Sequence, residues 1–328
     1  MRIGILGAGD MGGAHARFYR AMPDVEIAGI VGRTESKVQG IASEVGILGF
    51  TDPRCVLDDE TVEAVDLCYP TYLHAEYAIA ALQRGKHVFC EVPLALTLEE
   101  TDAMLAAARA AGRLLLVAFV VRFVDTNVYV RDVVRAGELG APRVATMTYL
   151  FQRGPSWAAR TAAGFGTVLV EQVSHEFDYL NWLWGKPTAV RTTGLAGAHG
   201  DLEHLFVSLE YPGQHAHVEV STLLPASHPF TTHLRVICEQ GALETTFRLR
   251  ADGPPETLLT LYPAAGAPET PAIPDEDPYG TECRYFVDCV AGKADPARMS
   301  AEAARDALQV ALAAQASFAR GGEQVVVV

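Results

Sequence analysis

The sequence has no long hydrophobic run, little lysine and cysteine, and few aromatic residues. Its longest apolar run, residues 114–121, is eight residues long, whereas a membrane-spanning helix needs about 20. Acidic residues outnumber basic ones by 40 to 26, for a net charge of −14, and this sign disfavours nucleic acids and anionic membranes as partners. Six cysteines without zinc-finger spacing indicate reduced thiols rather than a disulfide framework. We therefore expect a globular, cytoplasmic protein without a metal site.

Short apolar runs alternate with helical stretches over the first 120 residues. The predicted strands are residues 2–6, 26–31, 64–68, 87–90 and 113–119, and the predicted helices are 14–21, 36–45, 74–84 and 97–111. The last helix opens with Thr97 followed by Glu100, which fits a capping box. Strands that are apolar throughout and separated by helices predict a parallel sheet covered on both faces. Residues 1–120 are therefore predicted to be a doubly wound Rossmann domain.

The pattern changes over residues 121–328. Strand-like runs follow one another with a single helix, 171–184, among them, and two helices, 282–291 and 300–320, come near the end. This order predicts an α+β domain with a large, mostly antiparallel open sheet. A sheet with one uncovered face would favour association, so we expect a homodimer or homotetramer.

A glycine-rich segment joins the first predicted strand to the helix after it. It reads Gly7-Ala8-Gly9-Asp10-Met11-Gly12. At the start of a βαβ unit, glycines with this spacing permit a tight turn, a close backbone approach to a pyrophosphate, and close helix–strand packing. The N–H groups of the helix start can then bind phosphates. We expect Gly7, Gly9, Asp10, Met11 and Gly12 to bind a dinucleotide, the alternative being an ordinary strand–helix turn.

The end of the second predicted strand bears on the choice of cofactor. NAD-binding proteins usually place Asp or Glu there for the ribose 2′-hydroxyl, but this chain has Gly32, then Arg33 and Thr34, with Lys37 beyond. A guanidinium suits a phosphate by bidentate geometry, and glycine leaves room for one. The pattern favours NADP over NAD, bound by Arg33, Thr34 and Lys37. The alternative is NAD, with its ribose bound by Glu35.

Further motifs are spread along nearly the whole chain. They are residues 69–77 (Tyr-Pro-Thr-Tyr-Leu-His-Ala-Glu-Tyr), 85–93 (Gly-Lys-His-Val-Phe-Cys-Glu-Val-Pro), 137–140 (Gly-Glu-Leu-Gly), 175–178 (His-Glu-Phe-Asp) and 300–304 (Ser-Ala-Glu-Ala-Ala). With the glycine-rich segment, they resemble the Gfo/Idh/MocA family of NAD(P)-dependent oxidoreductases, which act mostly on sugars and cyclitols. The resemblance implies a Rossmann domain followed by an open α/β domain whose sheet often forms an oligomer interface.

The resemblance also implies roles for individual residues. His175 is the expected acid/base, because the unperturbed pKa of histidine lies near neutrality, and Glu171, one predicted helical turn earlier, would support it. The implied cofactor contacts are Pro70, His74, Glu91 and Pro93. The implied substrate contacts are Val92, Arg122, Arg153, Trp157, Asp178 and Tyr179. The alternatives are a structural histidine on the helix face for His175, a helix-start residue for His74 and a helix brace for Asp178. Packing roles are the alternatives for Arg153, Trp157 and Tyr179.

One position departs from the family pattern in its chemistry. The family triplet is Glu-Lys-Pro, with the lysine near substrate and nicotinamide, but here it is Glu91-Val92-Pro93. Valine neither donates a hydrogen bond nor titrates. The chain has only four lysines, Lys37, Lys86, Lys186 and Lys293. Lys86 begins the strand that precedes Glu91, about 20 Å from position 92, so no local replacement is visible.

Three functions are compatible with these features. The favoured one is an enzyme that transfers a hydride between a nicotinamide cofactor and a carbinol or carbonyl carbon of a sugar- or cyclitol-like substrate. The loss of lysine at position 92 motivates a second, a dinucleotide-binding sensor without dehydrogenase turnover. The third is a glycosidase-type member of the family that keeps its cofactor bound throughout the cycle.

Overall fold

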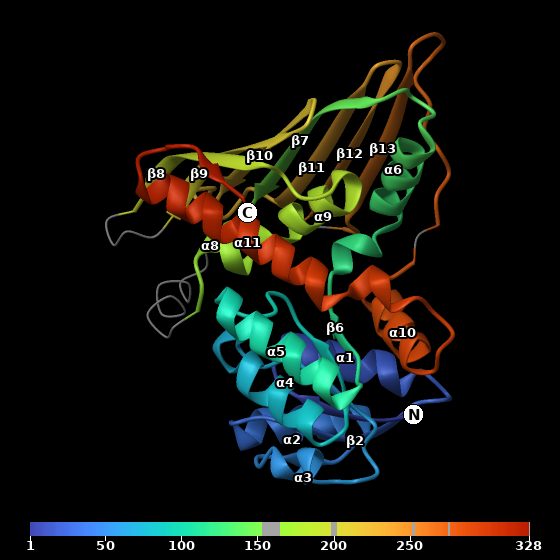
Figure 1. Ribbon diagram of the computed structural model, residues 1–328. Coiled ribbons are helices and arrows are strands. Elements are labelled where there is room, and N and C mark those ends of the chain that lie inside the picture. Colours follow the sequence, from blue (N-terminus) through green and yellow to red (C-terminus); the bar gives the residue numbers. More distant parts are fainter. Residues whose placement is uncertain (153–164, 198–201, 251–252, 275, 328) are drawn as a thin grey trace. The chain divides into compact units, whose positions relative to one another are not determined.

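The structure is a computed structural model that describes residues 1–152, 165–197, 202–250, 253–274 and 276–327 (Figure 1). It divides into two compact units. The first comprises Met1–Phe123 and Glu276–Leu308, and the second comprises Val124–Asp275 and Gln309–Val328. The sequence predicted one boundary at residue 120. In the structure this boundary lies at residue 123, and residues 276–308 also belong to the first unit.

The first unit contains a six-stranded parallel sheet in the order β3-β2-β1-β4-β5-β6. Its strands are β1 (Arg2–Leu6), β2 (Glu26–Val31), β3 (Gly49–Phe50), β4 (Ala64–Leu67), β5 (His87–Cys90) and β6 (Leu115–Val117). This is the doubly wound order, with the chain reversing direction across the sheet between β1 and β4. The predicted Rossmann domain is therefore confirmed. In such sheets a ligand binds beyond the carboxyl ends of the strands at this reversal.

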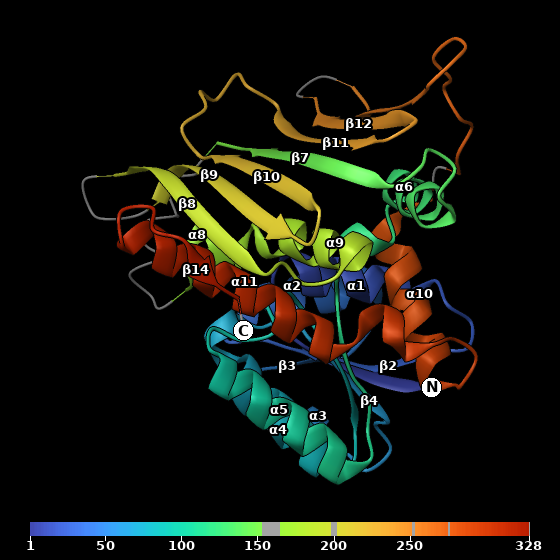
Figure 2. The same ribbon diagram turned by 45° about the horizontal axis from the view of Figure 1, so that its top comes forward.

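Helices cover this sheet. They are α1 (Asp10–Arg20), α2 (Glu35–Val45), α3 (Arg54–Leu57), α4 (His74–Gln83), α5 (Leu98–Ala111), α10 (Pro278–Val290) and the short 3₁₀ helices η1 (Thr71–Leu73), η2 (Val120–Arg122) and η3 (Pro296–Met299). Helices α4 and α5 pack together, and α1 packs against both α2 and α10 (Figures 1 and 2). Buried Phe286 and Val287 of α10 belong to the same apolar core as Ile3, Ile5 and Phe89 of the sheet. Residues 276–308 thus complete the core of the first unit.

The second unit contains an eight-stranded sheet in the order β13-β12-β11-β7-β10-β9-β8-β14. Its strands are β7 (Pro142–Leu150), β8 (Ala189–Ala196), β9 (Leu202–Tyr211), β10 (Gln214–Ser221), β11 (Phe230–Cys238), β12 (Gly241–Leu249), β13 (Glu256–Pro263) and β14 (Val325–Val326). All neighbouring pairs are antiparallel except β7 and β10. The predicted mostly antiparallel open sheet is confirmed. The unit also contains α6 (Asp125–Ala136), α8 (Val168–Glu171) and α9 (Ser174–Trp184), and α11 (Ala301–Ala319) crosses the division between the units.

The helix predicted over residues 171–184 is interrupted. Helix α8 ends at Glu171, Gln172 departs to φ −119°, and α9 begins at Ser174. The expectation that Glu171 and His175 lie one turn apart on a continuous helix is therefore wrong. Among the described residues, no helix is long and apolar enough to cross a membrane.

Candidate active site

The glycine-rich segment forms a tight turn from β1 into α1. Gly7 has φ +138°, and a Cβ there would collide with the carbonyl oxygen of Cys68, while a Cβ on Gly12 would collide with the carbonyl oxygen of Gly7. A Cβ on Gly9, by contrast, would have no heavy atom within 4 Å. Gly9 and Asp10 are exposed and Met11 is half-buried. The first and last glycines thus permit the turn, and the middle one leaves open space at the N-terminus of α1, which suits a pyrophosphate.

The carboxyl end of β2 has no room for an acidic side chain. A Cβ on Gly32 would lie 2.7 Å from the Cβ of Ala8. Arg33, Thr34 and Lys37, the residues predicted to contact the cofactor here, are all exposed. Burial, and then the charge of Tyr77, raise the pKa of Tyr69, and the charge of Arg33 opposes this rise. The guanidinium therefore acts on a residue that follows β4, the strand across the reversal point.

His74 connects the two loops that follow β4 and β5. Its ring is buried, with Nε2 2.7 Å from the carbonyl oxygen of Tyr69 and Nδ1 2.9 Å from that of Pro93. Burial lowers the pKa of His74, and its contacts with these carbonyls oppose that effect. A neutral imidazole donates to one of them, and the charged form donates to both. The structure thus gives His74 a bracing position beneath the loop that contains Pro70.

The triplet Glu91-Val92-Pro93 follows β5 at the same edge, and its Val92–Pro93 peptide is cis. Pro93 is buried, whereas Glu91 and Val92 are half-buried. Lys86, at the other end of β5, is buried and donates to the carbonyl oxygens of Asp59 and Val62. Lys86 is thus held at the amino ends of the strands and does not replace the family lysine.

A buried charged cluster lies directly behind Glu91. His15 of α1 bonds Asp66 of β4 through Nδ1 (2.8 Å), and its Nε2 is 3.3 Å from Oε1 of Glu91. Cys68 donates its thiol to Asp66 (3.1 Å). Burial lowers the pKa of His15, but the charge and hydrogen bond of Asp66, with the charges of Glu91 and Glu282, raise it to about 10. This pKa favours the imidazolium form of His15 between Asp66 and Glu91, and burial raises the pKa of Glu91 while the charge of His15 opposes that effect.

Sequence reasoning did not single out Asp66, His15 or Glu282 as site residues. Glu282 of α10 is buried, and burial followed by the charge of Glu91 raises its pKa well above the usual range. One signal was available. Asp66 stands in the otherwise apolar strand Ala64-Val65-Asp66-Leu67, and a carboxylate in a fully buried strand needs a charged partner. No local sequence pattern indicated that His15, and Glu282 more than 200 residues away, would surround Asp66.

In the second unit, His175 lies in the first turn of α9. It is half-buried, and burial lowers its pKa to about 4. The imidazole is therefore neutral at physiological pH and able to accept a proton. Glu171 is buried and accepts a hydrogen bond from the backbone N–H of Gly166 (3.0 Å). Glu176, the residue after His175, is also buried, which raises its pKa to about 8.

Three other residues predicted to contact the substrate are buried in the protein interior. Tyr179 is fully buried and donates to the carbonyl oxygen of Asn127 (2.9 Å), which ties α9 to α6, and Asp178 is fully buried as well. Arg122, in the first unit, is buried and donates to the carbonyl oxygen of Arg298 (2.9 Å). Arg153 and Trp157 lie outside the described residues.

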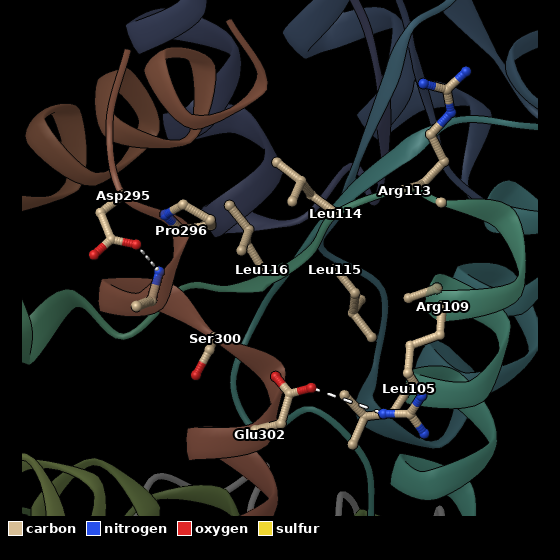
Figure 3. A pocket seen from close by; sticks show the side chains of 13 residues that line it. Leu105, Arg109, Arg113, Leu114, Leu115, Leu116, Asp295, Pro296, Ser300 and Glu302 are labelled. Atoms are coloured by element: carbon tan, nitrogen blue, oxygen red, sulfur yellow. Dashed lines mark hydrogen bonds and ion pairs between the residues drawn. The ribbon is translucent and has the colours of Figure 1, made fainter. Parts of the chain in front are cut away.

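A pocket of about 460 Å³ lies elsewhere in the first unit. Leu105 and Arg109 of α5 face Asp295, Ser300 and Glu302 across it, with residues 113–116 forming its floor (Figure 3). Residues 112–114 lead into the amino end of β6, whereas ligands bind in such sheets at the carboxyl ends of the strands. It is not part of the candidate site.

Comparisons with known proteins agree with this geometry. Residues 1–119 match the model of the oxidoreductase family with an NAD-binding Rossmann fold, and residues 128–244 match the GFO/IDH/MocA C-terminal domain. The chain belongs to the Gfo/Idh/MocA oxidoreductase family. Both halves of this family fold are present, so the resemblance seen in the motifs is confirmed, and the chain is an oxidoreductase with an NAD-binding domain.

Relatives within the Gfo/Idh/MocA family include two dehydrogenases similar over most of this chain. Myo-inositol 2-dehydrogenase of Thermotoga maritima is 26% identical over 274 residues, covering 81% of this chain and 79% of the relative. The scyllo-inositol 2-dehydrogenase (NAD(+)) of Bacillus subtilis is 27% identical over 337 aligned positions, covering 98% and 95%. An aldose-aldose oxidoreductase structure from Caulobacter crescentus, 22% identical, superposes with a TM-score of 0.85 over 99% of both chains. That structure supports the fold alone.

Proposed function

We propose that the protein is an NADP-preferring dehydrogenase or reductase of a sugar- or cyclitol-like substrate. The observation that carries the cofactor preference is the end of β2, where Gly32 has no space for an acidic side chain and Arg33 is exposed. A guanidinium there can pair with a 2′-phosphate in bidentate geometry. Thr34 and Lys37 stand beside it at the start of α2 and add a hydroxyl and a second positive charge.

The remaining cofactor contacts are proposed along the same edge of the sheet. The open space at Gly9 suits the pyrophosphate, with Asp10, Met11 and Gly12 at the start of α1. Pro70 and Glu91 follow β4 and β5, where the nicotinamide ribose is expected, and His74 and Pro93 fix those loops. When bound, the nicotinamide supplies the hydride donor or acceptor.

We assign the acid/base role to His175. Oxidation of a carbinol requires loss of the hydroxyl proton, and a neutral imidazole can accept it. Glu171 would support His175 from the end of a separate helix, because α8 ends at Glu171 and α9 begins at Ser174. The substrate class follows from the relatives, which include inositol dehydrogenases and a D-glucoside 3-dehydrogenase. Val92 favours a substrate that makes an apolar contact at that position.

The second candidate is a nucleotide-binding sensor without turnover. It is favoured by one observation: Val92 stands where the family has lysine, and Lys86 is held at the other end of β5. Hydride transfer that depends on His175 would eliminate this candidate.

Nucleotide titration is the first test. Binding of NADPH and NADH to the purified protein is followed by fluorescence, with Arg33→Gln and the matched surface variant Arg20→Gln. We expect NADPH to bind at least tenfold more tightly than NADH, since a charged hydrogen bond is worth about 1.5–3 kcal/mol. Arg33→Gln should remove that preference, and Arg20→Gln should keep it. Tighter binding of NADH would refute the cofactor preference and point to Glu35.

We also propose a homodimer or homotetramer formed through the open face of the eight-stranded sheet. The strand register puts Thr193, Phe206 and His217 on one face, and continues that face across β7 to Ile237 of β11. Phe206 and Ile237 are among the exposed large apolar residues. Exposed apolar side chains gathered on one sheet face favour association.

A further inference from the structure

Two contacts within the first unit determine the orientation of the Glu91 carboxylate. Its Oε2 accepts a hydrogen bond from the backbone N–H of Val92 (3.3 Å), and its Oε1 faces Nε2 of His15 at 3.3 Å. The side chain retains 17% exposure, whereas those of His15 and Asp66 have none. The carboxylate therefore has one side toward the interior and one toward the edge of the sheet where the cofactor is proposed to bind.

The imidazole of His15 is itself immobilised. Nδ1 is fixed by Asp66, and the ring stacks on Phe89 of β5 (centroids 5.7 Å apart, planes 14° apart). Phe89 in turn stacks on Phe286 of α10 (4.9 Å, 14°). The hydrogen bond fixes the direction of the ring, and the stacking fixes its plane, so Nε2 can point in only one direction. Residues 276–308 contribute to this arrangement through Phe286.

The charges around His15 come from every element that packs on it. Asp66 belongs to β4, Glu91 follows β5, and Glu282 lies on α10, with Tyr19 of α1 and Cys68 and Cys283 as further titratable neighbours. The ring of His15 lies between the carboxyl groups of Asp66 and Glu91. Nδ1 is hydrogen-bonded to Asp66, and Oε1 of Glu91 lies at ion-pair distance, 3.3 Å, from Nε2, so the buried ring has an acidic partner on each side.

We propose that His15 is a positioning residue that orients Glu91 for contact with the nicotinamide nucleotide. Asp66 fixes the ring of His15, and His15 in turn restricts the half-exposed carboxylate of Glu91. This carboxylate lies at the edge of the sheet where the cofactor is proposed to bind. This inference rests on the proposed contact between Glu91 and the cofactor. His15 itself is fully buried and acts only through Glu91.

The ligating atoms of His15, Cys68 and Glu91 lie within 4.8 Å of one another, as they would around a metal ion. Two contacts favour the ion pair instead. Asp66 accepts hydrogen bonds from both His15 and Cys68, and burial raises the pKa of the Cys68 thiol well above its usual range, which disfavours the thiolate that a metal requires. Retention of one equivalent of zinc by the purified protein would overturn our assignment.

A double-mutant cycle on nucleotide binding tests the proposal. His15→Asn keeps a donor where Nδ1 meets Asp66 but removes Nε2, whereas His15→Gln places a donor near the position of Nε2. Each is made with Glu91 and with Glu91→Gln, and Kd values for NADPH and NADH are measured by fluorescence. Tyr19→Phe, a change in the same cluster that keeps all three members of the chain, is the matched control.

We expect His15→Asn to weaken binding about tenfold when Glu91 is present, and less than twofold when Glu91→Gln is present, because coupled residues are not additive. His15→Gln should recover part of the loss, and Tyr19→Phe should bind as the unaltered protein does. Equal losses in both backgrounds, or no loss, would overturn the proposal. If Glu91→Gln alone binds normally, both the Glu91 contact and this inference fail, while cofactor binding stands. If the unaltered protein binds neither nucleotide, the proposed function itself fails.

A second measurement needs no substitution. The ¹⁵N shifts of the His15 ring in the unaltered protein should show both nitrogens protonated at pH 8. A neutral ring at pH 8 would overturn the proposal even if the variants do not fold.

Discussion

His175 shows how burial can shift the acid–base chemistry of a single residue. Burial lowers its pKa to about 4, so the base form persists well below the usual range. The sequence predicted His175 as a residue whose ordinary pKa lies near neutrality. It could not predict the shift, because the shift depends on how the surrounding chain covers the imidazole.

The first prediction concerns the pH dependence of this residue. If His175 is the base, kcat/KM for oxidation should stay constant as pH falls from 8 toward 5, and should decline only as pH nears 4, when the imidazole becomes protonated. His175→Gln should lower kcat by about 10²–10⁴-fold and leave the nucleotide Kd unchanged. His87→Gln, at the amino end of β5 in the first unit, is the control. If kcat/KM instead declines around pH 6.5, burial does not lower the pKa of the catalytic base, and the prediction is wrong.

Val92 is the second prediction at this scale. Its side chain is half-buried at the cofactor edge, and lysine at this position would supply the donor and charge that the family pattern places there. We expect Val92→Lys to raise kcat on a polyol substrate by roughly a hundredfold, the lower end of the range for a positioned acid or base. Val92→Met, similar in length but uncharged, should not. Equal rates for the two variants would mean that this site does not use a lysine.

At the scale of elements, structural features that depend only on neighbouring residues were predicted well from the sequence. Thr97 accepts a hydrogen bond from the N–H of Glu100 (3.1 Å), and Glu100 accepts one from the N–H of Leu96 (3.2 Å). The predicted cap of α5 is therefore present. The break between α8 and α9 was not predicted, because residues 168–184 contain no proline or glycine before Gly185 and long-range packing determines where the helix is interrupted.

The cap of α5 leads to a stability prediction. Thr97→Ala removes the acceptor for an N–H at the helix start, and should lower the free energy of unfolding by about 1 kcal/mol. Thr97→Ser, which keeps the hydroxyl, should lower it by much less. Urea denaturation followed by circular dichroism measures both. Equal losses for the two variants would show that the threonine methyl, not the hydrogen bond, is responsible.

At the scale of the whole molecule, the order of elements predicted both sheets but not the path of the chain between the units. Residues 276–308 were assigned to the second domain because they follow its strands. Their buried face instead packs on the first sheet through Phe286 and Val287. No local pattern distinguishes a helix that covers its own sheet from one that returns to another, so contacts far apart in sequence decided this feature. The cluster around His15 shares that origin.

Association through the open face of the second sheet is the last prediction. Phe206 and Ile237 project from it, together with polar Arg235 and Glu244. Phe206→Glu would place a charge in the proposed contact and should weaken the assembly by at least about 2 kcal/mol, or more than tenfold in dissociation constant. Leu48→Glu, at an exposed leucine of the first unit, should leave it intact. Light scattering after size-exclusion chromatography distinguishes the two, and a monomeric unaltered protein at micromolar concentration would show that this face is free in solution.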